Sequence, residues 1–300
     1  MLNLLLAAGF TAGLFICFRL FGRFHVPVFQ AIIINYFTCV LIGLMVSGGG
    51  FHNVNDFFLT PYLYFTMGLG LLFVSTFYLV GYTARYVSVT LSSVANKMSM
   101  VIPMIAAVWI ADIPTGALDL FQWLGLLLSL LSIVFSSINP QGNSQDPLVS
   151  SWKMALLPVA VFIMSGLVDT GINLGNYLYL KEGDKNGFII SVFFFAGTAG
   201  LIAALIGKLP WSWKAIAGGI SLGTVNYFSL ILLLKALDDF NNDAVFVFPA
   251  LNILTILIAG TVSVFAFGEQ LGRYRRWALF LSFAAILLLS YKEWFRLLLG

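Results

Sequence analysis

Charged side chains are scarce in this 300-residue sequence, at 9% of residues, and the net charge at neutral pH is only +3. Soluble domains carry about 25% charged residues, so this chain has too few polar groups to cover a water-soluble globule. The scarcity excludes a soluble enzyme and a disordered chain, and the small net charge excludes a surface that tracks nucleic-acid phosphates. Hydrophobic residues make up 60% of the chain, with a mean hydropathy of +0.99. The composition predicts an integral membrane protein.

Cysteine is scarce as well, because the sequence contains only Cys17 and Cys39, both within apolar runs. Two such residues provide neither a disulfide framework nor a metal-binding motif. His25 and His52 have no candidate metal ligands beside them, and the phosphate-binding loop G-x-x-x-x-G-K-[ST] is absent from the sequence. We therefore expect no metal, no cofactor and no direct use of ATP.

Long hydrophobic runs dominate what is present. A helix that crosses the hydrocarbon core needs about 20 apolar residues. The stretches near this length are residues 2–18, 26–47, 61–84, 88–111, 117–138, 153–180, 187–207, 213–235, 243–267 and 274–292. They are continuous and lack the two-residue alternation of barrel strands. The first run precedes its basic residues, which favours a helix over a signal peptide. We predict an all-α integral membrane protein with ten transmembrane helices.

A polar stretch at residues 139–152 divides these helices five and five. We predict a first repeat over residues 1–138, a linker over 139–152 and a second repeat over 153–300. Both halves contain a helix with a mid-span polar residue, then an acidic helix end, then a Trp near the start of the last helix, at Trp123 and Trp277. Because five is odd, tandem halves must lie in the membrane with opposite orientation, as the inverted repeats of secondary transporters do.

The passage Ala84–Gly125 and, more clearly, Phe267-Gly268-Glu269-Gln270-Leu271 followed by Arg276-Trp277 resemble the drug/metabolite transporter superfamily, in particular the EamA-type transporter family. The first half departs from the family pattern, because Asp112-Ile113-Pro114 stands where the family has a Gly-Glu pair. The resemblance implies two EamA-like five-helix repeats and a bacterial inner-membrane carrier, commonly an exporter of amino acids or related metabolites. It also implies cytoplasmic termini, whereas the positive-inside rule favours the opposite orientation.

Two ionisable residues lie near the middle of predicted membrane helices, Lys97 in the fourth and Asp169 in the sixth. Such residues cost at least about 2.5–3.5 kcal/mol to insert and usually face a cavity or a partner. An ammonium would bind a substrate carboxylate, and a carboxylate would bind a substrate amine or carry the coupling proton. The alternative is a structural salt bridge between the two.

Mid-span amides accompany these charges on several helices. The candidates are Asn96, Asn173, Asn252, Asn226 and Asn35. Five helices that each offer one polar face predict a shared hydrated cavity, although each amide alone is also explained by an ordinary interhelical hydrogen bond. The motifs Gly9-x-x-x-Gly13 and Gly219-x-x-x-Gly223 predict close helix packing, and Pro103 and Pro249 predict kinks in the fourth and ninth helices.

Together these features predict a secondary active transporter that exports small polar or amphipathic metabolites such as amino acids by alternating access. Its partners would be the metabolite, the lipid bilayer and protons as the coupling ion, with no nucleic acid. A carrier for sugar phosphates, nucleotide sugars or hydrophobic drug-like cargo is the alternative. From a different class, an intramembrane prenyltransferase-like enzyme would bind Mg²⁺-diphosphate through Asp239 and Asp243. The sequence lacks the second acidic cluster that this chemistry needs, so we expect that the protein is not an enzyme and has no catalytic residue.

Overall fold

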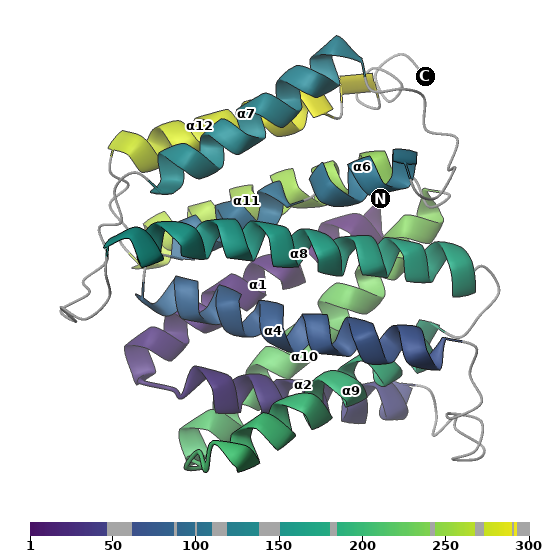
Figure 1. Ribbon diagram of the computed structural model, residues 1–300, viewed down its shortest axis with the longest axis vertical. Helices are drawn as coiled ribbons and strands as arrows, with labels where there is room; N and C mark the ends of the chain where they lie inside the picture. The colour runs from purple at the N-terminus through teal and green to yellow at the C-terminus, as the bar shows by residue number, and fades with distance from the viewer. Residues whose placement is uncertain are drawn as a thin grey trace.

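The computed structural model describes residues 1–46, 62–86, 89–99, 101–109, 119–137, 151–180, 185–240, 244–267, 273–289 and 291–292. Nearly all of these residues are helical, and no strand occurs among them. The helices (Figure 1) are α1 (Leu2–Phe24), α2 (Val28–Val46), α4 (Leu63–Tyr86), α5 (Val89–Met98), α6 (Val101–Trp109), α7 (Leu120–Ser137), α8 (Ser151–Tyr179), α9 (Lys185–Ile206), α10 (Trp213–Asp239), α11 (Ala244–Phe267) and α12 (Arg273–Leu289).

The helical class and the membrane setting are confirmed. Within the described ranges, six helices are long and apolar enough to cross a membrane, namely α1, α2, α4, α8, α9 and α10. The chain is therefore an integral membrane protein. Each predicted apolar run coincides with helix in the part of the chain that is described, and the fourth run contains two helices, α5 and α6. The number of membrane crossings stays a prediction.

A break separates α5 from α6 in the middle of the fourth run, where α5 ends at Met98 and α6 begins at Val101. Pro103 explains the break, because it has no N–H to donate to the carbonyl of Ser99 and its ring clashes with that carbonyl. The Ser99 carbonyl instead accepts from the N–H of Ile102, at 2.9 Å, in a tighter turn. The structure therefore has an interruption where the sequence predicts a kink at Pro103, whereas α11 continues through Pro249 from Ala244 to Phe267.

The helices pack in a regular pattern of neighbours (Figure 1). Helix α1 contacts α10 and α11, while α8 contacts α4, α5 and α6. Helix α2 lies against both α9 and α10, and α9 also contacts α4. Helices α7 and α12 pack mainly against each other, at the opposite side of the molecule from α2 and α9.

Helices α2 and α10 approach each other at backbone distance. A Cβ atom on Gly219 would lie 2.7 Å from the carbonyl oxygen of Ala31, and one on Gly223 would lie 2.6 Å from that of Asn35. These distances are shorter than van der Waals contact, so the second small-residue motif is the packing notch that the sequence predicts. The first motif is packed at one end only: a Cβ on Gly13 would lie 3.0 Å from Val225 Cγ1 on α10, whereas one on Gly9 would meet nothing within 4 Å.

A polar cluster joins the start of α7 to the segment after α12. Asp119 and Gln122 form a capping box, in which each side chain accepts from the backbone N–H of the other, at 3.0 and 3.1 Å. The Asp119 carboxylate also accepts from the Tyr291 hydroxyl and lies 3.1 Å from Lys292 Nζ. The hydrogen bond from Tyr291, with the contacts to Gln122 and Lys292, lowers the pKa of Asp119 to about 2.

Candidate functional site

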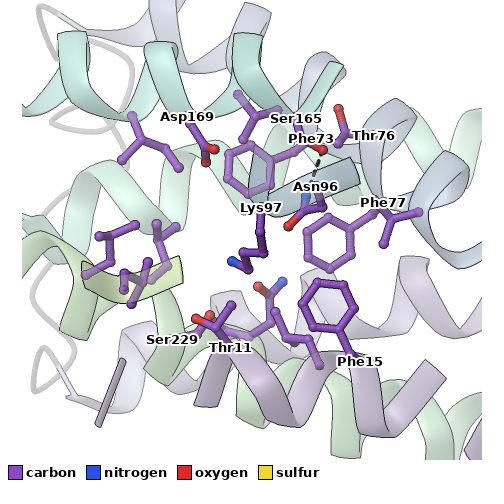
Figure 2. A pocket seen from close by; sticks show the side chains of 18 of the residues that line it. Thr11, Phe15, Phe73, Thr76, Phe77, Asn96, Lys97, Ser165, Asp169 and Ser229 are labelled. Atoms are coloured by element: carbon purple, nitrogen blue, oxygen red, sulfur yellow. Dashed lines mark hydrogen bonds between the residues drawn. The ribbon is translucent and has the colours of Figure 1, made fainter. Parts of the chain in front are cut away.

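A cavity of about 760 Å³, its open mouth included, lies between α1, α4, α5, α8, α10 and α11 (Figure 2). Its walls are mostly apolar, with a few polar groups that come from different helices. The lining residues are Thr11, Leu14, Phe15, Phe18, Phe73, Thr76, Phe77, Val80, Asn96, Lys97, Ser165, Val168, Asp169, Ile172, Asn226, Ser229, Leu230, Leu233 and Leu251.

Lys97 and Asp169 both face this cavity without pairing. Lys97 is only 6% exposed, and Figure 2 shows its side chain extending into the cavity, with Asp169 on the wall formed by α8. The Lys97 Nζ lies 5.8 Å from the centroid of the Phe15 ring, which is within cation–π range. Among the residues that the structure describes, none forms a hydrogen bond or an ion pair with this ammonium. The direct salt bridge considered as an alternative is therefore not formed in this structure.

The C-terminal turn of α5 carries Lys97, and its orphan carbonyls are bound by side chains. The Asn252 amide on α11 donates to the Lys97 carbonyl oxygen at 2.8 Å, and the Ser99 hydroxyl donates to the Asn96 carbonyl oxygen. The last four carbonyls of a helix have no partner inside it, so these bonds replace what the break removes. A cation in the last turn is also favoured by the helix dipole. The break thus creates a suitable place for Lys97.

Two side-chain contacts fasten this turn of α5 to α8. The Asn96 amide donates to Ser165 Oγ at 2.7 Å, and Ser99 Oγ lies 3.2 Å from the Asp169 carboxylate. Ser165 and Asp169 are one helical turn apart on α8, so they present their polar atoms to the same edge of α5. The cation of α5 and the carboxylate of α8 are held in fixed relation by these neighbours.

The structure brings four of the seven predicted site residues onto the cavity, Lys97, Asp169, Asn96 and Asn226. It does not place all of the predicted polar faces there, because the other three amides lie outside the lining, at Asn252, Asn35 and Asn173.

Each of these three amides is buried among packed helices. Asn252 binds the Lys97 carbonyl, and Asn35 Oδ1 accepts from the Asn226 amide at 3.1 Å. Both are interhelical hydrogen bonds of the kind that holds membrane bundles together. Asn173 is 2% exposed, and its Oδ1 has no hydrogen-bond partner in the described part of the chain. Whether a mid-span amide faces the cavity or a neighbouring helix therefore depends on how its helix is rotated in the packed bundle.

Sequence reasoning missed the walls that α1 and α4 provide and the part played by Ser99. Thr11 and Thr76 line the cavity beside Phe15 and Phe77. Threonine in an apolar helix is ordinary because its hydroxyl binds its own helix, as Thr11 does with the Ala7 carbonyl at 2.7 Å. Ser99 carried a usable signal, since it lies four residues before Pro103, where a helix carbonyl loses its partner.

Comparison with known proteins adds a fold but no activity. No protein-family model matches the chain. An uncharacterized protein from Haemophilus influenzae is 22% identical over 303 residues, which cover 97% of this chain and 98% of the relative. A protein of known crystal structure superposes with a TM-score of 0.65 at 12% identity, over 97% of this chain and 96% of that one. This likeness concerns the fold, and it extends along nearly the whole chain.

Proposed function

We propose that this protein is a secondary transporter of the EamA type that exports small polar or amphipathic metabolites, such as amino acids, across the bacterial inner membrane. The observation that carries the proposal is a cavity among membrane helices that holds a cation and a carboxylate not paired with each other. Ionisable groups inside a membrane are costly, and they persist where they serve a ligand or ion pathway.

The chemistry of the lining favours a cargo that carries both charges. An ammonium at Lys97 is a partner for a carboxylate, and the Asp169 carboxylate is a partner for an amine or a proton. Phenyl rings also line the cavity, including Phe15, Phe73 and Phe77, and they suit the apolar part of an amphipathic metabolite.

The packing of the helices supports an architecture of two inverted repeats of five helices. In order along the two halves, α1 is the counterpart of α8, α2 of α9, α4 of α10, the α5–α6 pair of α11, and α7 of α12. The contacts follow this correspondence: α1 packs against α10 and α11, and its counterpart α8 packs against α4 and the α5–α6 pair. Likewise, the contact between α2 and α10 has its counterpart in the contact between α9 and α4. The contacts α2–α9 and α7–α12 each join a helix to its own counterpart. A pseudo-two-fold axis between inverted repeats produces this relation, and alternating access follows when such halves rock about a central site.

The competing functions fit the site less well. A sugar phosphate or a nucleotide sugar needs several converging cations, and Lys97 is the one cationic residue in the described lining. A purely apolar drug-like cargo would leave both charges without a partner. For the prenyltransferase-like alternative, Asp239 accepts a hydrogen bond from the Asn3 amide at 3.1 Å at the end of α10, and Asp243 lies outside the described residues. We propose no enzymatic step and no cofactor.

Thermal unfolding of the purified protein across a panel of metabolites tests this proposal. The panel contains amino acids, sugar phosphates and apolar amines. A ligand at 100 times its Kd stabilises by about 2.7 kcal/mol, so an amino-acid ligand is expected to raise the melting temperature measurably. Lys97→Ala is expected to remove this increase, because the carboxylate loses its cation.

Lys214→Ala is the matched control, since this lysine lies at the start of α10, where it donates to the Phe24 carbonyl, outside the cavity lining. A ligand-induced increase that survives in Lys97→Ala would contradict the role of Lys97. Absence of any increase with small polar metabolites would contradict the cargo class and favour a lipid-like cargo instead.

A further inference from the structure

The hydroxyl group of Ser99 has two acceptors but only one proton. Its oxygen is within hydrogen-bond distance of the Asn96 carbonyl oxygen and lies 3.2 Å from Asp169 Oδ2. A serine hydroxyl donates one hydrogen bond and accepts up to two. If Asp169 is ionised, both neighbours are pure acceptors, and Ser99 can satisfy only one of them.

A proton on Asp169 removes this conflict. The protonated carboxyl donates its O–H to Ser99 Oγ, and Ser99 then donates its own proton to the Asn96 carbonyl. When the proton leaves, the charged carboxylate competes for the Ser99 hydroxyl, and hydrogen bonds to a charged acceptor are roughly twice as strong as neutral ones. The hydroxyl therefore turns to Asp169, and the Asn96 carbonyl at the end of α5 loses its side-chain cap.

We propose that Ser99 is the residue that couples proton binding at Asp169 to the end of α5, by capping the Asn96 carbonyl only while Asp169 carries a proton. The affected turn is the one that holds Lys97, next to the break before α6. Loss of the cap loosens this turn, so the proton on α8 controls how firmly the cation on α5 is positioned. Ser99 is a positioning residue in this scheme and does not touch the cargo.

No other titratable group competes for this role among the described residues around Asp169. The helices packed against α8 are α4, α5, α6 and α7. From α5 the charged group that faces the cavity is Lys97, and the cavity residues from α4 are Phe73, Thr76, Phe77 and Val80, none of which titrates. The sequences of α6 and α7 contain no titratable residue at all. Within this part of the chain, Lys97 and Asp169 are the titratable residues of the cavity lining.

Amide hydrogen exchange at the end of α5 tests the inference, measured on the full-length protein in detergent at acidic and at mildly alkaline pH. After correction for the intrinsic pH dependence of exchange, the last turn of α5 in the wild type should exchange about tenfold faster at alkaline pH, the factor expected for one capping hydrogen bond. Ser99→Ala should exchange fast at both pH values. Asp169→Asn should exchange slowly at both, because an amide N–H replaces the O–H of the protonated carboxyl.

Two further variants keep the test decisive. Ser92 is buried on the same helix, and its hydroxyl donates to the Val80 carbonyl at 2.9 Å rather than to a carboxylate, so Ser92→Ala should retain the pH dependence. Ser99→Thr keeps the hydroxyl and should restore the wild-type behaviour. Exchange in the wild type that does not depend on pH, or a pH dependence that survives in Ser99→Ala, would overturn the inference.

The consequence for transport rests on the proposed function, but the exchange measurement needs no cargo. If exchange at the end of α5 depends on pH but the protein transports no metabolite, the proposed function is contradicted and the proposed role of Ser99 is supported. If the protein transports a metabolite but exchange at the end of α5 does not depend on pH, the proposed function is supported and the proposed role of Ser99 is contradicted.

Discussion

Two groups of polar residues lie inside the helical bundle, and they differ in whether their hydrogen bonds are complete. Between α2 and α10, the Asn226 amide donates to Asn35 Oδ1, the Asn35 amide is 3.4 Å from the Ile32 carbonyl, and Cys39 Sγ lies 3.2 Å from the Gly223 carbonyl. Around the cavity, the Lys97 ammonium forms no hydrogen bond or ion pair within the described residues, and it lies 5.8 Å from the centroid of the Phe15 ring. Buried polar groups normally find partners. A charged group left incomplete on the wall of a cavity therefore marks a place for a ligand, whereas the bonds between α2 and α10 hold helices together.

The largest effect is expected at the carboxylate that faces the cavity, Asp169. Asp169→Asn removes the site that would exchange a proton but keeps a hydrogen-bonding side chain. In liposomes containing the purified protein, we expect this variant to lose cargo accumulation driven by a pH gradient and to retain exchange of cargo across the membrane.

Asp239→Asn is the control for that experiment, because Asp239 lies at the solvent end of α10, outside the cavity lining. Loss of both activities in Asp169→Asn, or of neither, would show that Asp169 is not the proton site. Such a result would also mean that facing the cavity does not mark Asp169 as functional.

A smaller effect, on stability rather than transport, is expected between α2 and α10. Asn35→Ala leaves the buried Asn226 amide without its acceptor. Hydrogen bonds between membrane helices contribute about 0.6 kcal/mol on average and up to about 1.7 kcal/mol, so the free energy of unfolding should fall by about 1 kcal/mol. Thermal unfolding with and without ligand measures this change, and the ligand-induced increase should remain. A variant that keeps its stability but loses its ligand would reverse the assignment of the two regions.

The smallest effect is expected at Asp119, whose carboxylate has its hydrogen-bond and ion-pair partners but is exposed to water. Its pKa is lowered to about 2, chiefly by the hydrogen bond from Tyr291, from an ordinary value of 3.8. A lowered pKa stabilises the folded state above the ordinary value, and this contribution is lost as the pH falls toward about 2. We expect Asp119→Asn to melt slightly below the wild type at neutral pH and to match it near that acidic value.

Exposed ion pairs contribute little, so the Asp119 difference should be smaller than that of Asn35→Ala. Tyr291→Phe should reproduce part of it, since it removes the same hydrogen bond. A difference that persists unchanged in acid would mean that the carboxylate charge is not its cause.

The sequence predicted the helices well because hydropathy and proline act locally. Apolar length located each helix, and Pro103 marked the place where the fourth run departs from a straight helix, although a kink rather than an interruption was predicted there. Lys97 and Asp169 were visible for the same reason, since a charge within an apolar run is conspicuous. The facing of Asn35 and Asn252 was not predictable, because helix rotation depends on packing with distant segments. The role proposed for Ser99 was visible only in part, because its spacing from Pro103 is in the sequence, whereas its contact with Asp169 depends on how α5 packs against α8.

The glycines of α10 have a mechanical consequence. With Gly219 and Gly223 against the α2 backbone, α2 and α10 approach too closely to admit a larger side chain between them. Asn226 and Ser229 follow on α10, and Figure 2 places Ser229 across the cavity from Ser165 and Asp169. Because α2 belongs to the first proposed repeat and α10 to the second, any rocking of the two halves has to occur about this close contact.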